Sequence, residues 1–243
     1  TMNSISSLRT GAAWPRAFAM FCVVLALFGQ GVARAAEIVI GQVAPLTGVL
    51  ASSGEQMVLG GKIYFDAVNA QGGVHGATLH QLVVDDGYDV SKTVARTREL
   101  LARPDVVALF GFAGTANITQ LLKDGVLADG GAALVAPYTG GESLRSPFNP
   151  WIFHVRAGYV DEAEHMVQQL TTLNMNRIAV MYQDDGFGQS GLEGVEAALA
   201  RRKLNLAAVA SYPRNTDDVA AAVKTISAAN VHAVIMIAVN KPA

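Results

Sequence analysis

The feature that most constrains this chain is a strand, loop and helix near its start, a unit that the rest of the sequence repeats. Residues 38–40 are an apolar run typical of a buried strand, and the loop that follows at 44–48 is rich in turn residues. Ser52 or Ser53 is expected to cap a helix with apolar residues at helical spacing. Glycines at 72–73 end it, because glycine adopts the left-handed conformation that a helix end prefers.

The same alternation continues to the last residue. Further strands are predicted at 79–84, 106–110, 132–135, 151–156, 177–182, 204–211 and 231–238. The helices between them are predicted from Asp89 or Ser91 to Leu101, from Thr115 or Asn117 to Val126, and at 161–173, 187–202 and 217–228. Alternating strands and helices imply an α/β fold, in which each parallel sheet is flanked by helices on both faces.

A break in this rhythm divides the chain. Residues 146–150, Ser-Pro-Phe-Asn-Pro, favour an exposed, extended connection. The predicted domains are therefore an N-terminal lobe at 36–150 and a C-terminal lobe at 151–243.

The first 35 residues are predicted to be a signal peptide. Arg9 and Arg16 precede an apolar run at 17–28, and an Ala-Arg-Ala cleavage pattern follows at 33–35. The alternative is a membrane anchor, but the apolar run is shorter than the roughly 20 residues that a span needs. Cys22 lies inside this segment, so the mature chain is expected to lack thiols, which excludes disulfides and cysteine-based sites.

Composition argues against several functional classes. The net charge of −2 gives no indication of nucleic-acid binding. The five histidines lie far apart, so no metal site and no catalytic group is predicted. The acidic pair Asp85–Asp86 is expected to form a turn or a helix cap rather than a pair of acid–base catalysts.

A glycine motif leaves an enzymatic alternative open. Residues 186–191 match G-x-G-x-x-G after a predicted strand, which is typical of a dinucleotide site. However, Asp184 and Asp185 stand where a pyrophosphate would lie, and no acidic residue ends the next strand to bind a ribose. A nucleotide-dependent α/β enzyme is therefore the less favoured reading, and no cofactor is expected.

Three segments in a fixed order carry a resemblance to a known family. They are Pro-Leu-Thr-Gly at 45–48, the helix end at 66–76 (DAVNAQGGVHG) and Val-Asp-Asp-Gly-Tyr-Asp-Val at 84–90. From Glu37 onward the chain resembles periplasmic substrate-binding proteins of ABC transporters, in the leucine/isoleucine/valine-binding branch. The resemblance implies a two-lobe type I fold with a ligand in the cleft between the lobes and no enzymatic activity. Because family members are longer, the second lobe is expected to be incomplete.

The same resemblance implies a function. The protein is expected to be a periplasmic receptor that delivers an amino acid, an amide or a related carboxylate to an ABC permease in the inner membrane, and to be a monomer when complete. A ligand-sensing domain of the same fold, not coupled to transport, is the alternative. An incomplete second lobe also predicts an unpaired sheet edge, uncovered apolar surface and weak binding.

Candidate ligand-binding residues lie where the predicted strands end. Loops at 52–54, 113–115 and 138–140 offer hydroxyls, small residues and backbone N–H groups near helix starts, which suit a carboxylate without lysine or arginine. The alternative is that these residues are only helix caps.

The resemblance assigns roles to single positions. Thr115 matches a hydroxyl that binds the ligand carboxylate, and Tyr138 matches a position whose backbone atoms bind it. Gly140 replaces a threonine with Thr139 one place earlier, and Phe187 replaces a tyrosine. Ser53 replaces an aromatic residue. The complete predicted site is Ser53, Ala113, Thr115, Tyr138, Thr139, Gly140 and Phe187. These departures weaken the case for a leucine-like ligand, and the acidic residue that binds its amino group would lie beyond Ala243.

Overall fold

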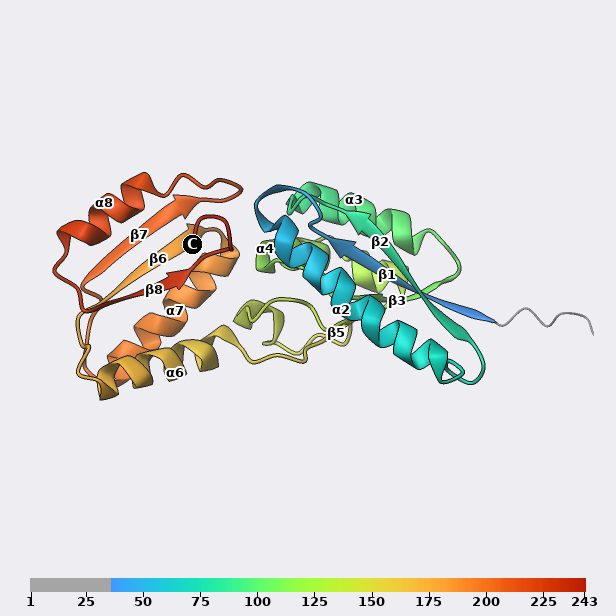
Figure 1. Cartoon of the computed structure of the whole chain (residues 1–243), viewed down its shortest axis with the longest axis horizontal. Coiled ribbons are helices and arrows are strands. Elements are labelled where there is room, and N and C mark those ends of the chain that lie inside the picture. Colours follow the sequence, from blue (N-terminus) through green and yellow to red (C-terminus); the bar gives the residue numbers. More distant parts are fainter. Residues whose placement is uncertain (1–35) are drawn as a thin grey trace, which may run out of the picture. The chain divides into compact units, whose positions relative to one another are not determined.

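The computed structural model describes residues 36–243, which form two parallel sheets with their helices (Figure 1). The predicted signal peptide and its cleavage site at 1–35 lie outside the described residues. None of the described helices is long and apolar enough to cross a membrane. The alternation of strands and helices and the parallel pairing confirm the predicted α/β fold.

The first sheet has the strand order β2-β1-β3-β4-β5, and every pair in it is parallel. Its strands are β1 (Glu37–Ala44), β2 (Thr78–Asp85), β3 (Val106–Phe110), β4 (Leu134–Val135) and β5 (Ile152–Phe153). Its helices are η1 (Gly48–Leu50), α2 (Ala51–Ala70), α3 (Val90–Leu101), α4 (Thr115–Lys123), α5 (Val126–Gly130) and η2 (Glu142–Leu144). The order changes direction between β1 and β3, which makes a topological switch point where ligands bind in open α/β sheets.

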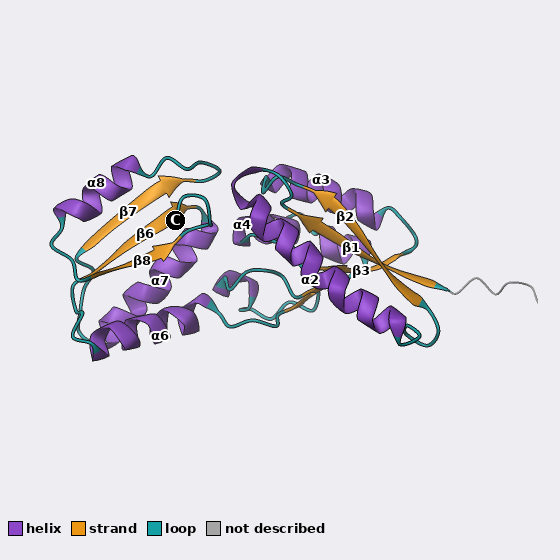
Figure 2. Ribbon diagram, viewed as in Figure 1, coloured by secondary structure: helices purple, strands orange, loops and turns teal. Residues whose placement is uncertain are grey.

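Helices cover the first sheet unequally. On one face α3, α4 and α5 bury a continuous apolar cluster that includes Val43, Leu109 and Ile118. On the other face α2 crosses the strands (Figure 2), and Phe65 of α2 packs on Phe110 with ring centroids 5.6 Å apart. Apolar side chains of β3, β4 and β5 remain 37–57% exposed: Val107, Val135 and Phe153. The helices therefore leave some apolar surface of the first sheet uncovered.

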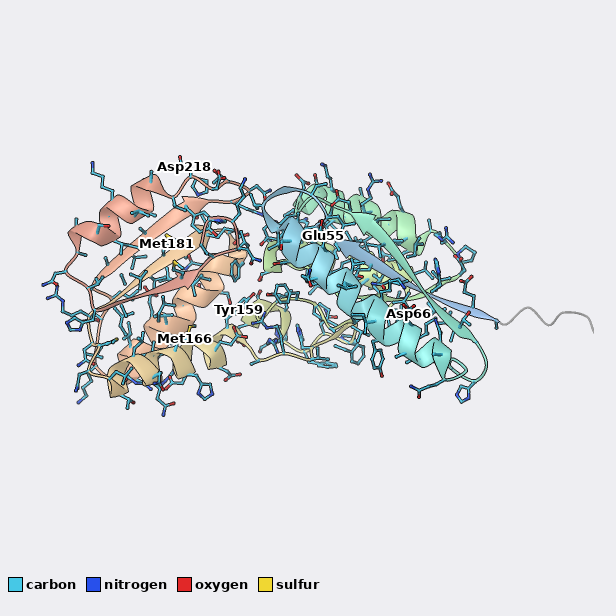
Figure 3. All side chains as sticks on the ribbon, viewed as in Figure 1. Glu55, Asp66, Tyr159, Met166, Met181 and Asp218 are labelled. Atoms are coloured by element: carbon cyan, nitrogen blue, oxygen red, sulfur yellow. The ribbon has the colours of Figure 1, made fainter. Side chains whose placement is uncertain are left out.

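The second sheet has the order β7-β6-β8, again entirely parallel, with a switch point between β6 and β8. Its elements are α6 (Tyr159–Thr172), β6 (Ile178–Asp184), α7 (Gly186–Arg201), β7 (Ala208–Pro213), α8 (Ala220–Ala228) and β8 (Ala233–Ile237). One apolar cluster joins α6 and α7 to the sheet, and a separate one joins α8 to it. Figure 3 places Tyr159 and Met166 on α6 and Met181 on β6.

Two predicted helix caps are wrong. A 3₁₀ turn, η1, leads into α2 after Leu50, so Ser52 and Ser53 lie inside the helix instead of capping it. The cap of α4 is Gly114, with a φ of 97°, where a Cβ would lie 2.4 Å from the Asn117 side chain. Only glycine fits there, so neither Thr115 nor Asn117 takes that position.

Other predictions held. Of the two predicted caps of α3, Asp89 and Ser91, the structure shows Asp89, which accepts a hydrogen bond from the Lys92 N–H at 2.9 Å. Ile152 and Phe153 pair with β4, so the first sheet takes in residues past the predicted lobe boundary at Pro150. The division into lobes at that point stays a prediction.

Candidate functional site

A cavity of about 280 Å³ lies where strands of both sheets reach their carboxyl ends. Leu50 follows β1 and Gly114 follows β3, the two strands at the first switch point. Phe187 follows β6 and Ile237 ends β8, the strands at the second switch point. The complete lining is Leu50, Tyr88, Gly114, Thr115, Tyr138, Arg156, Tyr159, Glu162, Ala163, Met166, Phe187, Gly191, Met236, Ile237, Ala238, Val239 and Asn240. Strands at the switch points of both sheets therefore end at one cavity, which is where ligands bind in open α/β sheets.

The start of α4 supplies the polar end of this cavity. Gly114, the N-cap, has no side chain with which to bond the first backbone N–H groups, so these keep their partial positive charge. Thr115 is 2% exposed and shares a hydrogen bond of 2.7 Å with Thr139. The Thr139 hydroxyl also accepts the Gly141 N–H at 3.1 Å. When Thr139 donates to Thr115, the Thr115 proton remains available to a ligand oxygen.

The structure brings three of the predicted site residues to the cavity: Thr115, Tyr138 and Phe187. Three others lie directly behind them. Ala113 pairs with Tyr138 through the backbone, and Thr139 bonds the Thr115 hydroxyl. The Gly140 carbonyl accepts the Tyr159 N–H at 2.8 Å, and a Cβ on Gly140 would lie 2.7 Å from the Tyr159 ring.

Ser53 is not part of the lining. Because the 3₁₀ turn η1 comes directly before Ala51, the helical conformation begins before Ser52, earlier than the sequence predicts. Leu50 consequently takes the position at the cavity, and Ser53 lies in the first turn of α2.

Sequence reasoning missed the wall formed by α6. Tyr159, Glu162, Ala163 and Met166 follow the spacing i, i+3, i+4 and i+7, which places them on one helix face. That periodicity is visible in the sequence, but it equally fits a helix face packed in a core. The segment 236–240 was also missed, because only the topology of the second sheet brings its end to the cavity.

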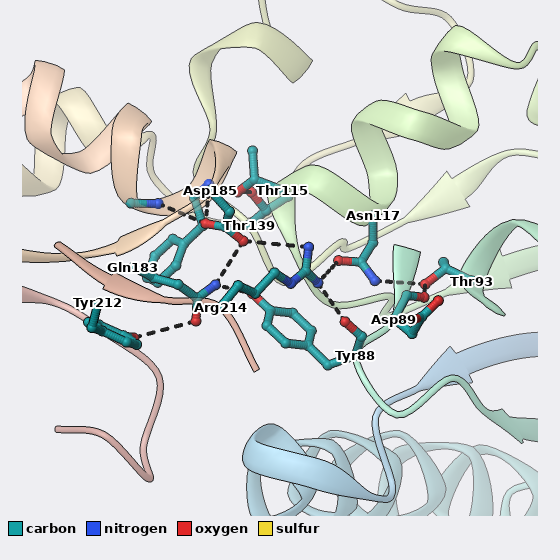
Figure 4. A network of polar contacts seen from close by, with 12 residues as sticks. Tyr88, Asp89, Thr93, Thr115, Asn117, Thr139, Gln183, Asp185, Tyr212 and Arg214 are labelled. Atoms are coloured by element: carbon teal, nitrogen blue, oxygen red, sulfur yellow. Dashed lines mark hydrogen bonds and ion pairs between the residues drawn. The ribbon is translucent and has the colours of Figure 1, made fainter. Parts of the chain in front are cut away.

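A network of polar contacts centred on Arg214 connects the two sheets beside the cavity (Figure 4). The Arg214 guanidinium donates to the Tyr88 carbonyl and to Asn117 Oδ1, each at 2.6 Å, and lies 4.1 Å from the centre of the Tyr88 ring. From the second sheet, Asp185 Oδ2 lies 3.5 Å from Arg214 Nη1. Tyr88 lines the cavity, so this network supports one of the cavity walls.

The network continues through buried groups on both sides. Gln183 is fully buried and donates to Asp185 Oδ2 at 2.7 Å and to the Tyr88 hydroxyl at 3.3 Å. Tyr212 donates to Gln183 Oε1 at 3.4 Å and accepts the Val239 N–H at 3.2 Å. Burial raises the pKa values of Tyr88 and Tyr212 above their ordinary value, so both hydroxyls keep their protons at neutral pH.

The glycine motif at 186–191 forms the start of α7 and not a phosphate site. Asp185 caps this helix, accepting the N–H groups of Phe187 at 2.9 Å and Gly188 at 3.2 Å. A carboxylate already occupies the place where a dinucleotide phosphate would bind, and it would repel one.

The acidic pair at the end of β2, Asp85 and Asp86, has the turn role predicted for it. Asp85 accepts the N–H groups of Leu46 and Gly87, each at 2.8 Å. Burial disfavours the ionised Asp85 carboxylate, but these bonds and one from Thr47 outweigh it and lower its pKa. Within residues 36–243 no cluster of His, Cys, Asp and Glu is arranged to hold a metal ion.

Residues 37–243 match the family model described as periplasmic binding protein. The chain belongs to this family. The resemblance found in the sequence is thereby confirmed, and family membership implies an extracytoplasmic location. The family is one of substrate-binding receptors rather than enzymes.

Individual relatives agree with this membership. Leu/Ile/Val-binding protein homolog 7 of Brucella melitensis is 26% identical over 224 residues, covering 87% of this chain and 55% of that protein. A substrate-binding periplasmic protein from Ralstonia solanacearum is 37% identical with a TM-score of 0.81 and is matched over 84% of this chain and 57% of its own. An extracellular ligand-binding receptor from Verminephrobacter eiseniae is 31% identical with a TM-score of 0.76. The match covers 84% of this chain and 57% of that receptor.

The chain thus spans a little over half the length of these relatives. This confirms the prediction that it is shorter than its family members, with an incomplete second lobe. The two sheets described here correspond to the matched part.

Proposed function

We propose that this chain is the ligand-binding part of an extracytoplasmic receptor that delivers a small polar molecule to an ABC importer. The observation that carries the proposal is the position of the cavity, which lies at the switch points of two sheets and includes the uncapped start of α4. An amino acid, an amide or a related carboxylate fits a space of about 280 Å³. The names of the Brucella and Verminephrobacter relatives support binding of a small ligand.

In this proposal Thr115 and the N–H groups of α4 bind the negatively charged or polar end of the ligand. Tyr138 and Phe187 contact its body. Ala113, Thr139 and Gly140 act indirectly by fixing the positions of Tyr138, Thr115 and Tyr159.

The test is a thermal-shift screen of amino acids, amides and small carboxylates, followed by calorimetric titration of the compounds that raise the melting temperature. Thr115→Ala removes a hydrogen bond to a charged group, worth roughly 1.5–3 kcal/mol, so affinity is expected to fall about ten- to a hundredfold. Thr225→Ala on α8, whose hydroxyl bonds its own helix at Ala221, is the matched control and leaves affinity unchanged. An unchanged dissociation constant in Thr115→Ala contradicts the assigned role, and a screen without any shift contradicts the receptor proposal.

The transport role and the location have their own tests. An importer partnership predicts that genes for a permease and an ATPase neighbour this one, whereas a sensor domain of the same fold predicts a signalling partner. Cleavage after the predicted signal peptide gives a secreted chain beginning at Ala36, which mass spectrometry detects. A retained N-terminus with membrane partition supports an anchor instead.

A further inference from the structure

The cavity contains a balanced pair of charges. Among its lining residues Arg156 and Glu162 are the charged side chains, and the remainder is aromatic, aliphatic or uncharged. The Arg156 guanidinium donates from Nη2 to Glu162 Oε1, forming an ion pair. Both members are only partly exposed, at 29% and 34%, so their charges are not fully screened by water.

Local structure fixes both members at the wall. The Arg156 guanidinium carbon lies 5.4 Å from the ring centres of both Tyr138 and Tyr159, an arrangement that stabilises a cation. Glu162 lies in the first turn of α6, where the helix dipole favours a carboxylate. Burial lowers the pKa of Arg156, but the hydrogen bond and charge of Glu162 outweigh it and raise the pKa above its ordinary value.

The pair also retains bonding capacity toward the cavity. A guanidinium has five N–H donors and a carboxylate about four acceptor positions. The described structure gives the two side chains one mutual hydrogen bond, from Nη2 to Oε1. A ligand in the cavity therefore meets a donor group and an acceptor group side by side, with no net charge between them.

We propose that Arg156 and Glu162 form a specificity-determining pair, which together selects ligands by their net charge. The cavity accepts a molecule with an aromatic or branched apolar body and no net charge, either an uncharged amide or a zwitterion. An anionic ligand is attracted by Arg156 but repelled by Glu162, and a cationic ligand is attracted by Glu162 but repelled by Arg156. Either ligand therefore loses its hydration without full compensation. The inference rests on the proposed binding function and specifies the chemical class of the ligand.

The body of the ligand follows from the rest of the wall. Tyr88, Tyr138, Tyr159 and Phe187 supply aromatic surface, and the rings of Tyr159 and Phe187 pack 5.5 Å apart. Two methionines, Met166 and Met236, add flexible apolar surface that adapts to irregular shapes and makes favourable contacts with rings.

Four probes with the same phenyl body separate charge from shape: L-phenylalanine (zwitterion), phenylacetamide (uncharged), phenylacetate (anion) and 2-phenylethylamine (cation). In calorimetric titration of the unmodified chain, the tighter of the two probes without net charge is expected to bind about tenfold more tightly than either charged probe. Glu162→Gln leaves Arg156 uncompensated, so phenylacetate gains about tenfold relative to phenylacetamide. Arg156→Met leaves Glu162 uncompensated and gives 2-phenylethylamine the corresponding gain.

Two further variants act as controls. Glu164→Gln removes a carboxylate from the same helix, α6, but Glu164 pairs with Arg201 and Arg202 and does not line the cavity, so the probe ranking is unchanged. Arg156→Lys keeps the charge and keeps the ranking even where the arginine stacking is lost.

The outcomes distinguish this inference from the receptor proposal. An identical ranking in the unmodified chain, Glu162→Gln and Arg156→Met overturns the charge-selecting role, as does failure of all four probes to bind. Either result leaves the receptor proposal standing if a different compound from the thermal-shift screen binds and depends on Thr115.

Discussion

The two sheets contribute different chemistry to the cavity. The first sheet brings the uncapped start of α4, the buried hydroxyl of Thr115 and backbone groups that Thr139 fixes in place. The second brings apolar bulk, mainly from α6, α7 and the end of β8. The charged pair lies at the start of α6, where the chain leaves β5 for the second sheet. In the proposed function the first sheet binds the polar end of the ligand, and the second encloses its body.

The two regions nevertheless share one turn geometry after their first strands. In each, the first turn of a helix lies close to the backbone of the segment before it, and a glycine in that turn leaves the necessary room. A Cβ on Gly54 would lie 2.0 Å from the Pro45 carbonyl oxygen, and one on Gly188 would lie 1.8 Å from that of Gln183. The neighbours are backbone atoms, so neither site has a flexible side chain that could move aside.

The largest expected effect comes from filling these two turns. Gly54→Ala and Gly188→Ala are each expected to cost about 3 kcal/mol or more of unfolding free energy, because the added methyl displaces backbone. Gly60→Ala, in the same helix as Gly54 and with no atom within 4 Å of the new Cβ, is the control and is expected to stabilise by about 0.5–1 kcal/mol. Urea unfolding midpoints measure all three. Equal midpoints for Gly188→Ala and the unmodified chain would show that the tight turn is not required.

Breaking the link between the regions is expected to have the next largest effect. Arg214→Met removes the bonds to Tyr88 and Asn117 and the charge beside Asp185, at a cost of about 2 kcal/mol. Trp151 fluorescence reports unfolding of the core of the first sheet, whereas far-UV circular dichroism reports the helices and strands of both sheets. The two unfolding transitions should then have different midpoints. Lys224→Met, an exposed change on α8, is the control. Coincident transitions in Arg214→Met would mean that the two regions are coupled by other contacts.

A smaller effect is expected at the threonine pair. Thr139→Val removes the partner of Thr115 and leaves the Gly141 N–H without its acceptor, at a cost of about 1–2 kcal/mol of unfolding free energy. Ligand affinity should fall less than in Thr115→Ala, because the Thr115 hydroxyl is still present but less well oriented. Calorimetric titration of both variants with one compound gives the two losses of affinity. A larger loss in Thr139→Val would indicate that Thr139 binds the ligand and that Thr115 positions it.

The smallest effect concerns a surface contact confined to the second region. Arg202 and Arg201 lower the pKa of Glu164 from 4.5 to about 2. A lowered carboxyl pKa contributes stability above pH 4.5 that is lost as the pH falls through about 2. The melting temperature of the unmodified chain should therefore exceed that of Glu164→Gln slightly above pH 5, with the difference vanishing near pH 2. A difference that stays constant over this range would contradict an ionic origin.

The regular elements were predictable because their signals are local. Apolar runs located β2 and β3 within a residue or two. Asp89 was one of two predicted caps of α3, because the N–H group that a cap binds lies only three residues away. Gly114 was missed as the cap of α4 because the reason for it is tertiary: the space for a Cβ is filled by Tyr88 and Asn117. The two-residue strand β5 joins the first sheet through pairing with β4, which no local pattern specifies.

The candidate site was predictable to a similar extent. The rule that ligands lie at the carboxyl ends of strands led to the loops of Thr115 and Tyr138, and the family resemblance added Phe187; all three residues line the cavity. Arg156, Glu162 and Val239 come from segments whose approach depends on how the two sheets are connected, so their residue types alone carried no signal.

Hydrogen exchange of backbone amides, with and without the compound that gives the largest thermal shift, tests most directly whether the two sheets form one binding site. Slower exchange on binding is expected in both 114–118, at the start of α4, and 236–240, at the end of β8, with 159–166 of α6 protected as well. Segments remote from the cavity, such as 220–228 of α8, should change little. Protection limited to one of the two sheets, or located away from the cavity, would contradict a single site built from both.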